Sequence, residues 1–544
     1  MMNLTIRRLL IFIFIGSTLL TLELSSENSL LMSLPFEEDI ISAILNQQKA
    51  DDKKHDAVIQ ALSNNIDTEL DEYNEIMQES AILEDSELLR IQEKASDEAK
   101  AEAKRIKNLY TLGDRDKPKD YQNLFDDSIK HTFRIEFTTS EWQGLIDDMN
   151  EYNDEFGTYK SNNYRSVNVI YSTPDETITI PDVGYRSKGN IYSRRLPVEG
   201  NGDVRPIHFV LKFNETFDTF EGTEAYDWLK TREVFDLENL IFKWNKQNDP
   251  TYINELFSYD MFRAAGVAVP EITMAKVEIV IDGQVELTEL YAVHEHIDEE
   301  FIRKNLQDTP TKEVGDLYKV VWNGTLEPIT DSYWYGVRDW ENNYRPVYGL
   351  ETNTDDPNFD DLVSFTTQLN SSNLVMRQQY LEDNFDIDSF LRAMAVNVLV
   401  FNPDDYRGNA NNYYLYFDEY GYMTYIPFDY DNSMCEGWLG EPVFINCSLG
   451  NDIYEWEGDG FSDWTDEQPL IDNLFDYDEY KTLYEDYLML LIDSEDFSYS
   501  NFSAMFDTLE SLYGDEFDMV NNKLWYISEK IDQVTEQVTF YRNN

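Results

Sequence analysis

Apolar and polar residues alternate in several short segments of the chain between residues 116 and 297. The alternating segments are residues 132–137, 166–171, 178–180, 208–213, 274–281 and 286–293. A period of two is typical of β-strands that bury one face. Residues 253–265 instead have a helical composition, and Gly266 and Pro270 follow them as residues that favour a helix end. The pattern predicts a mostly β unit with one central helix over about residues 116–297.

Helical periodicity dominates the rest of the chain, about residues 298–544. The predicted helices are residues 299–306, 360–369, 375–384, 388–401, 477–493 and 502–538, the last with a break at Gly514. One β-hairpin lies among them, with strands at 412–417 and 422–428 around a turn at 418–421. A β-rich half followed by a helical half predicts an α+β fold with two lobes, and ligands favour the interface of such lobes.

The N-terminal region has a different composition. Arg7 and Arg8 precede an apolar run from Leu9 to Leu22, which predicts a signal peptide or an N-terminal anchor within residues 1–25. Residues 26–115 are polar, rich in Glu, Lys and Ala and poor in Pro and Gly. They predict a charged helical spacer, or stalk, in front of a folded domain at 116–544. We therefore expect a secreted or cell-surface protein.

The charge of the chain restricts its partners. There are 43 Lys and Arg residues against 106 Asp and Glu residues, a formal net charge of −63 at pH 7. This charge repels nucleic acid and anionic lipid, so we expect no nucleic-acid partner and membrane attachment only through the N-terminal segment. A nucleotide site would have to be locally basic or to contain a divalent metal. Cys435 and Cys447 are the two cysteines, and a disulfide between them is expected in an oxidising compartment.

Oxygen-bearing side chains are concentrated at both open ends of the predicted hairpin. They are Asn402, Asp404, Asp405, Asn409, Asn411 and Asn412 before it, and Asp429, Asp431 and Asn432 after it. The hairpin would hold the two groups side by side, and carboxylate and amide oxygens suit a hard cation such as Mg²⁺ or Mn²⁺. The alternative is ordinary turn chemistry, since Asp and Asn commonly flank turns.

Several motifs in one order resemble the CotH-type (spore coat protein H) atypical protein kinases. The hairpin region, residues 402–416 followed by Ile426-Pro-Phe-Asp-Tyr-Asp431, is similar to the N-x-D…N-Y-Y-L-Y…P-W-D-x-D signature of that family, with Phe428 in place of the commoner Trp. Upstream, Gly184–Asn190 resembles its R-x-K-G-N segment. Residues 208–213, 256–270 and 291–298 are similar to the family segments that follow. The resemblance covers roughly residues 120–440.

The resemblance implies a two-lobed, protein-kinase-like fold that uses ATP with Mg²⁺ or Mn²⁺. Asp404 would be the catalytic base, because it lies eight residues before Asn412, although the adjacent Asp405 is an alternative. Asn412 and Asp429 would bind the metal. Asp431 would bind a second metal ion or make a hydrogen bond.

The same resemblance implies the nucleotide-binding residues. Lys212, on a predicted strand, would bind the α- and β-phosphates, and Lys188 is the alternative. Gly189 and the neighbouring Asn190 would let backbone N–H groups approach a phosphate. Glu295 would either contact adenine through its backbone or form a salt bridge with Arg303.

The expected function is phosphate transfer from ATP to Ser or Thr of extracellular or coat proteins. One alternative is a non-catalytic surface, coat or adhesin protein that uses the same fold. Another is a glycosidase, which needs two carboxylates on opposite sides of a sugar. No local pair of carboxylates in the sequence indicates that arrangement.

Overall fold

The computed structural model describes residues 117–190, 193–246, 249–306, 314–435, 452–454 and 468–543. The predicted signal segment at 1–25 and spacer at 26–115 lie outside these residues. The chain divides into two units, residues 1–116 with 302–313 and residues 117–301 with 314–544. The fold described below is that of the second unit.

Seven strands form a closed barrel in the first half of this unit. In barrel order they are β1 (His131–Phe137), β2 (Arg165–Ser172), β3 (Thr177–Ser187), β4 (Phe209–Lys212), β5 (Asn239–Lys243), β7 (Gln284–Glu295) and β6 (Ile272–Ile281). Neighbours are antiparallel except β1 and β6, which close the barrel in parallel. All six predicted strands are confirmed. β5 was not predicted because its residues 240–243 are all buried and therefore show no alternation.

Aromatic side chains fill the barrel. The rings of Phe209 and Phe242 stack at 4.5 Å between centroids, and Phe133 meets Phe242 edge-on at 5.0 Å. These residues come from β4, β5 and β1, so their packing ties neighbouring and distant strands together. This rigid core determines the direction of the side chains at the strand ends.

Four helices accompany the barrel: α6 (Lys119–Leu124), α7 (Thr139–Phe156), α8 (Glu224–Lys230) and α9 (Asn254–Ala264). α9 confirms the predicted helix at 253–265, but the expectation that it would be the single helix of this part of the chain is wrong. Thr138 caps the start of α7 by accepting a hydrogen bond from the Glu141 N–H, and Gly157 ends it with φ of 72°. The helix escaped prediction because it buries only Trp142, Leu145 and Met149, which is a weak apolar stripe.

A second, five-stranded sheet lies in the other half of the unit. Its order is β12 (Met423–Pro427), β11 (Tyr413–Phe417), β8 (Asp316–Val320), β10 (Tyr348–Leu350) and β9 (Tyr335–Val337). The predicted hairpin, β11–β12, is confirmed but is not isolated, because β8 pairs with the free side of β11. β9 and β10 are three residues long and so carry no recognisable period.

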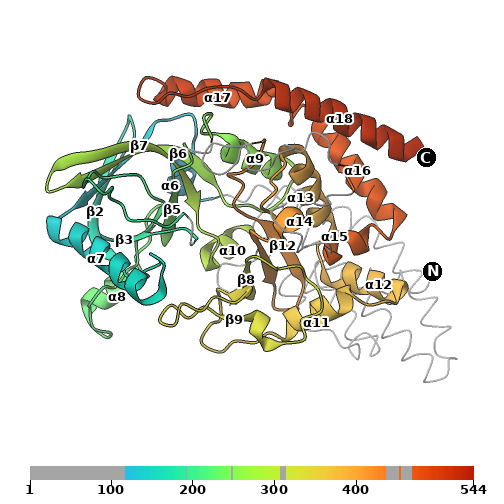
Figure 1. Ribbon diagram of the computed structural model, residues 1–544, viewed down its shortest axis with the longest axis horizontal. Coiled ribbons are helices and arrows are strands. Elements are labelled where there is room, and N and C mark those ends of the chain that lie inside the picture. The colour runs from blue at the N-terminus through green and yellow to red at the C-terminus, as the bar shows by residue number, and fades with distance from the viewer. Residues whose placement is uncertain are drawn as a thin grey trace, which may run out of the picture. The chain divides into compact units, whose positions relative to one another are not determined.

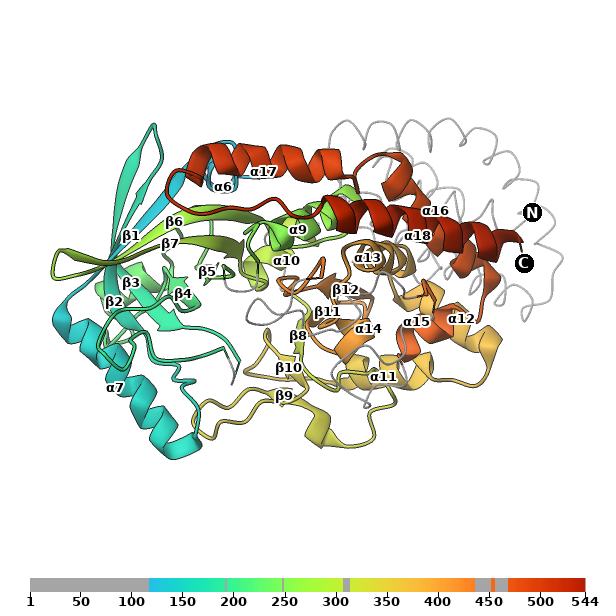
Figure 2. The ribbon, with the colours of Figure 1, turned by 45° about the horizontal axis from the view of Figure 1, so that its top comes forward.

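The other helices of the described residues follow along the chain. They are α10 (Glu299–Asn305), α11 (Asp360–Leu369), α12 (Leu374–Asn384), α13 (Ile387–Val400), α14 (Tyr406–Asn409), α15 (Pro469–Leu474), α16 (Asp478–Asp493), α17 (Tyr499–Tyr513) and α18 (Leu524–Asn543). The predicted helices are confirmed, including the break after Tyr513. α17 lies beside β6 and α18 beside α16 (Figure 1 and Figure 2). At the first of these contacts the Tyr513 hydroxyl donates to the Met274 carbonyl at 2.8 Å.

The fold is thus a mixed α+β arrangement of a barrel, a second sheet and surrounding helices. Cys435 is disulfide-bonded, and Cys447 lies outside the described residues. Among the described helices, none combines the length and apolar character needed to cross a membrane.

Candidate active site

The hairpin brings the two acidic segments together, as the sequence predicts. Tyr413 pairs with Pro427, and the Phe428 N–H donates to the Asn412 carbonyl at 3.2 Å, so the ladder continues past the strand ends. The Asn402 amide donates to the Asp429 carbonyl at 3.0 Å. Asn412 and Asp429 both have positive φ, 55° and 66°, a region in which Asn and Asp are the commonest side-chain-bearing residues.

Asp404 is held by three amide groups. Its Oδ1 accepts hydrogen bonds from Asn409 at 2.9 Å and from Asn411 at 3.0 Å, and its Oδ2 accepts from Asn412 at 3.0 Å. Burial raises the pKa of this carboxyl to about 6, and the amide donors act in the opposite direction. The carboxylate is therefore fixed in one orientation and is ionised near neutral pH.

Asp405 has a different environment from its neighbour. Its Oδ1 caps α14 by accepting from the Gly408 N–H at 2.9 Å, and its other oxygen accepts from the Asn397 amide. Both carboxylate oxygens are therefore engaged in the local fold, and the side chain is fully buried. Both oxygens of Asp404 are also hydrogen-bonded, but Asp404 is 6% exposed against 0% for Asp405, so Asp404 is the more accessible of the two to a substrate.

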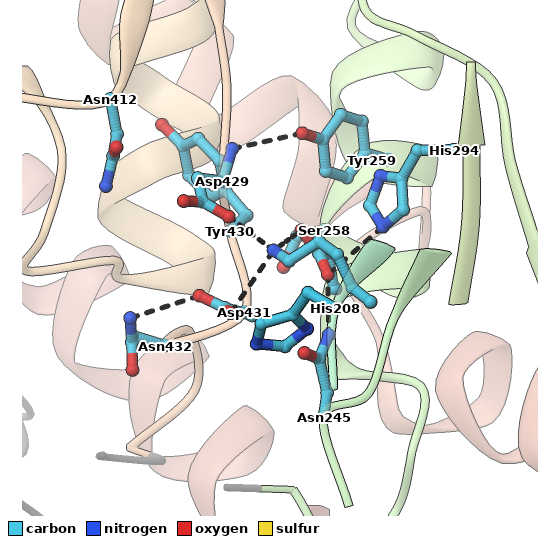
Figure 3. Close-up of polar contacts among 12 residues, drawn as sticks. His208, Asn245, Ser258, Tyr259, His294, Asn412, Asp429, Tyr430, Asp431 and Asn432 are labelled. Carbon is cyan, nitrogen blue, oxygen red and sulfur yellow. Dashed lines mark hydrogen bonds and ion pairs between the residues drawn. The ribbon is translucent and has the colours of Figure 1, made fainter. Parts of the chain in front are cut away.

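Lys243, which the sequence analysis did not single out, lies at the centre of the acidic residues. Its ammonium group is 2.7 Å from Glu255 Oε1 of α9 and 3.2 Å from Asp431 Oδ2, and it also contacts Asp429 Oδ1. Figure 3 shows Asp429 and Asp431 beside Tyr259 and His294 of the barrel side. Lys243 is the last residue of β5, so it joins the barrel to the segment after β12.

The second oxygen of Glu255 is also engaged. Glu255 Oε2 accepts from the Asn245 amide at 2.7 Å and lies 3.4 Å from His294 Nε2. In the sequence, a strand that ends in Lys243 is followed by a helix that carries Glu255, and this order could have indicated the ion pair. It was missed because β5 itself was missed.

Charge is unbalanced around Lys243. Burial acts against its positive charge, but Asp429, Asp431 and Glu255 outweigh burial and raise its pKa. Burial likewise opposes ionisation of Asp429, yet Lys243 and then Lys188 hold its pKa well below the usual range. For Asp431, burial together with the nearby Asp429 prevails over Lys243, and the pKa is raised. Three carboxyl groups thus share one contacting ammonium group, and the raised pKa of Asp431 reflects the negative charge that this single ammonium group does not balance.

Lys188 lies near this group without an ion pair to it. Its ammonium group is 5.1 Å from the centre of the Phe428 ring. Burial lowers its pKa to about 8, partly offset by Asp429. The next residue, Gly189, has φ of 129°, and a Cβ there would come 2.5 Å from Ser193 Oγ, so only glycine fits this turn. Asn190 Oδ1 accepts from the Ser193 N–H at 2.9 Å and closes the same turn.

The structure does not bring Lys212 or Glu295 into the group around Lys243. Lys212 forms a salt bridge with Glu215 at 3.1 Å and lies over the Tyr164 ring at 5.3 Å. Glu295 is buried, its N–H donates to the Glu271 carbonyl at 2.9 Å, and its side chain accepts from the Glu271 N–H at 3.2 Å. The predicted contact of its backbone with adenine stays a prediction, and this N–H is already used.

The donor set fits a divalent cation. The Asn412 amide nitrogen donates to the Asp404 carbonyl and carboxylate, so its Oδ1 is the atom left for a ligand. Asp429 and Asp431 add carboxylate oxygens and the unbalanced negative charge. In the described part of the chain, no three His, Cys, Asp or Glu side chains form a metal site by themselves. Mg²⁺ commonly takes one or two carboxylates and completes its shell with phosphates and water, which matches this set.

A model of one protein family, described as CotH kinase protein, matches residues 209–544. This is more than half of the chain. The chain belongs to the CotH kinase family. The matched residues include Lys243, Glu255 and the hairpin region, and they begin after the Gly184–Asn190 segment. A comparison with curated proteins gave no match.

Proposed function

We propose that this CotH family protein is an active kinase that transfers phosphate from ATP to Ser or Thr hydroxyls of extracellular or coat proteins. We further propose that the barrel and the helical half act as two lobes, with ATP between them, and that the N-terminal segment directs the chain out of the cell. The observation that supports catalysis most directly is the contact of Lys243 with Glu255, Asp429 and Asp431, beside Asp404 and Asn412.

Each side chain has a role in this proposal. Asp404 accepts the proton of the acceptor hydroxyl, whose oxygen then forms a bond to the γ-phosphorus while the bond from that phosphorus to ADP breaks. Lys243, oriented by Glu255, contacts the phosphates. Asn412 and Asp429, with Asp431, would hold Mg²⁺ or Mn²⁺, which neutralises developing phosphate charge.

The experiment compares two lysines that each end a barrel strand but lie at opposite ends of one antiparallel strand pair. Lys212 ends β4 and Lys243 ends the adjacent β5, and Lys212 pairs with Asn239 in the register that joins them. The full chain is incubated with labelled ATP, Mn²⁺ and a Ser/Thr-rich protein. We expect the Lys243→Met variant to lose at least about a hundredfold in transfer rate, since it removes phosphate contacts made in the transition state. We expect the Lys212→Met variant to stay within about twofold.

A second pair of variants tests the base. Asp404→Ala should lose transfer but still bind nucleotide, because Asp404 is proposed to contact the acceptor rather than ATP. Asp175→Asn, at an exposed turn, is the matched carboxylate control. Normal transfer by both the Lys243 and Asp404 variants, or a folded wild-type protein that transfers nothing with Mn²⁺ and ATP, would contradict catalysis.

A further inference from the structure

Six basic side chains gather beside the candidate active site in a protein that is otherwise strongly acidic. This cationic cluster consists of Lys160, Arg186 and Arg194 from the barrel half and Lys319, Arg338 and Arg345 from the second sheet and its loops. Lys160 lies between α7 and β2, and Arg186 is in β3. None of the six forms a salt bridge with a carboxylate among the described residues, whereas Arg134, Lys212, Arg263 and Lys276 of the same unit do. Glu351 lies near Lys319, Arg338 and Arg345 and partly offsets the lowering of their pKa values by burial.

Aromatic rings hold the cluster together. The guanidinium of Arg338 lies 3.1 Å from the centre of the Trp340 ring, and that of Arg186 lies 5.2 Å from the same ring. The Tyr152 hydroxyl of α7 donates to the Trp340 carbonyl at 3.1 Å, which fixes this loop to the barrel half. Ring faces attract a cation without cancelling its charge. The positive charge of the cluster is therefore available to a ligand.

The loop between β9 and β10 places two of the arginines near each other. Asp339 and Tyr344 form an antiparallel bridge, with N–H to carbonyl distances of 3.1 Å and 2.8 Å. Arg338 precedes this bridge and Arg345 follows it, so the two residues lie opposite each other at its open end. Arg186 contributes a further donor, because its Nε is buried and has no hydrogen-bond partner. Guanidinium groups suit bidentate binding of phosphate or carboxylate.

The cluster continues up to the phosphate-transfer residues. The Lys319 ammonium lies 4.3 Å from the centre of the Phe428 ring, the ring that Lys188 also faces, and Asp429 follows Phe428 in the chain. At the far side, burial together with Arg345, Arg338 and Arg194 lowers the pKa of Lys160 to about 8. The cations therefore repel one another from the edge of the site outward.

We propose that this cluster binds a segment of the acceptor protein that already carries several negative charges, phosphorylated Ser or Thr foremost. The inference rests on the proposed kinase activity. The nucleotide alone does not account for the cluster, because Lys188 and Lys243 already face the proposed phosphate position. An acceptor that is anionic near its target hydroxyl would neutralise the remaining cations. The enzyme would then favour sites close to earlier phosphorylation.

The test uses three peptides of equal length around one target Ser, with phosphoserine, Glu or Gln at the flanking positions. For the full chain, KM should fall in the order Gln, Glu, phosphoserine, with roughly a tenfold difference between the extremes, about the worth of one charge-assisted hydrogen bond. In R338Q/R345Q this difference should shrink to about twofold, while KM for ATP is unchanged. In R338K/R345K, which keeps the positive charges but loses the bidentate guanidinium groups, the KM difference should lie between those of the wild type and R338Q/R345Q. R134Q, which removes an arginine already paired with Glu136 and Glu278, should behave as wild type.

Two results would overturn the inference. Equal KM values for the three peptides in the wild type would show that the acceptor is not read by its charge. A higher KM for ATP in R338Q/R345Q, with the peptide preference intact, would assign the cluster to the nucleotide. Should the protein transfer no phosphate, fluorescence anisotropy with the labelled phosphoserine peptide and no nucleotide still decides the matter. Binding that weakens about tenfold in R338Q/R345Q supports the anion site, and no binding by the wild type refutes it.

Discussion

Two neighbouring regions of this protein treat buried charge in opposite ways. Around Lys243, one ammonium group is shared by Glu255, Asp429 and Asp431. A short distance away, beyond the Phe428 ring, the six residues of the cationic cluster form no salt bridge in the described part of the chain, and Glu351 acts on three of them from a longer distance. The first region has more carboxyl groups than contacting ammonium groups, and the second has more cations than carboxylates.

The difference indicates what each region is built to receive. A buried charge without its opposite is costly, so an excess of one sign persists where a ligand of the other sign supplies the balance. The Lys243 region is suited to a divalent cation and the cationic cluster to phosphate or another anion. Side by side, they would receive a metal-bound phosphate chain on one side and an anionic acceptor on the other.

Removing the shared cation should have the largest effect. Lys243→Met leaves the buried Glu255 and the partly exposed Asp429 and Asp431 with no contacting ammonium group, and we expect a loss of about 3 kcal/mol in the free energy of unfolding. Lys212→Met, which breaks a partly exposed pair with Glu215, should cost at most about 1 kcal/mol. Urea denaturation of both variants measures the difference. Equal losses of stability would mean that the ion pairs of Lys243 contribute no more to folding than the surface pair of Lys212.

The second-largest effect is expected from adding a divalent cation, which should stabilise the Lys243 region. With Mn²⁺ at a hundred times its Kd, mass action predicts about 2.7 kcal/mol of added stability in the wild type. Asp429→Asn should abolish most of this gain. Asp282→Asn, at an exposed turn where the aspartate accepts from the Thr139 N–H at 3.2 Å, should keep it. Thermal unfolding with Mn²⁺ or EDTA reads the gain, and an equal gain in both variants would place the metal elsewhere.

Asp386, which lies outside both regions, tests whether ionising a buried carboxyl group without a contacting cation lowers the stability of the folded chain. Asp386 caps α13 by accepting from the Ser389 N–H at 3.1 Å, and burial raises its pKa from 3.8 to about 6. Between these pH values the unfolded chain releases the proton and the folded chain keeps it. Stability therefore falls as pH rises through this window and is level above it.

The substitution Asp386→Asn keeps the cap but removes the ionisation. We expect it to raise the free energy of unfolding at pH 7 by about 2 kcal/mol and to make no difference below pH 4. Urea denaturation at the two pH values, with Asp175→Asn as control, measures this. A variant that is less stable at pH 7 would refute the argument.

The smallest effect is expected in the cationic cluster, and with the opposite sign to Lys243→Met. Arg345→Gln removes one of several mutually repelling cations, so the free energy of unfolding should stay level or rise by up to about 1 kcal/mol. Arg134→Gln loses partly exposed ion pairs with Glu136 and Glu278, so its free energy of unfolding should fall by a few tenths of a kcal/mol. Differential scanning calorimetry in a buffer without phosphate measures both. A loss above about 1 kcal/mol in Arg345→Gln would mean that this arginine has a structural partner.

Much of the fold followed from local pattern. The six alternating segments became barrel strands, and α9, α13 and the hairpin lie within a residue or two of their predicted bounds. The failures have physical causes. α7 has a narrow apolar stripe, β5 is buried on both faces, and β9 and β10 are too short for a period. In each case the buried face is determined by distant neighbours rather than by the segment itself.

The sequence by itself determined that Asn402–Asn412 and Asp429–Asn432 would meet, because a hairpin joins them and its register follows from a short turn. It did not determine which lysine meets them. Lys212 and Lys243 both end strands, and only the closed barrel, with β5 between β4 and β7, turns Lys243 toward Glu255 and Asp429 and Lys212 toward Glu215. The cationic cluster likewise joins residues from 160 to 345, and no local pattern connects positions so far apart in the chain. Ion pairs depend on position in space, which tertiary packing decides.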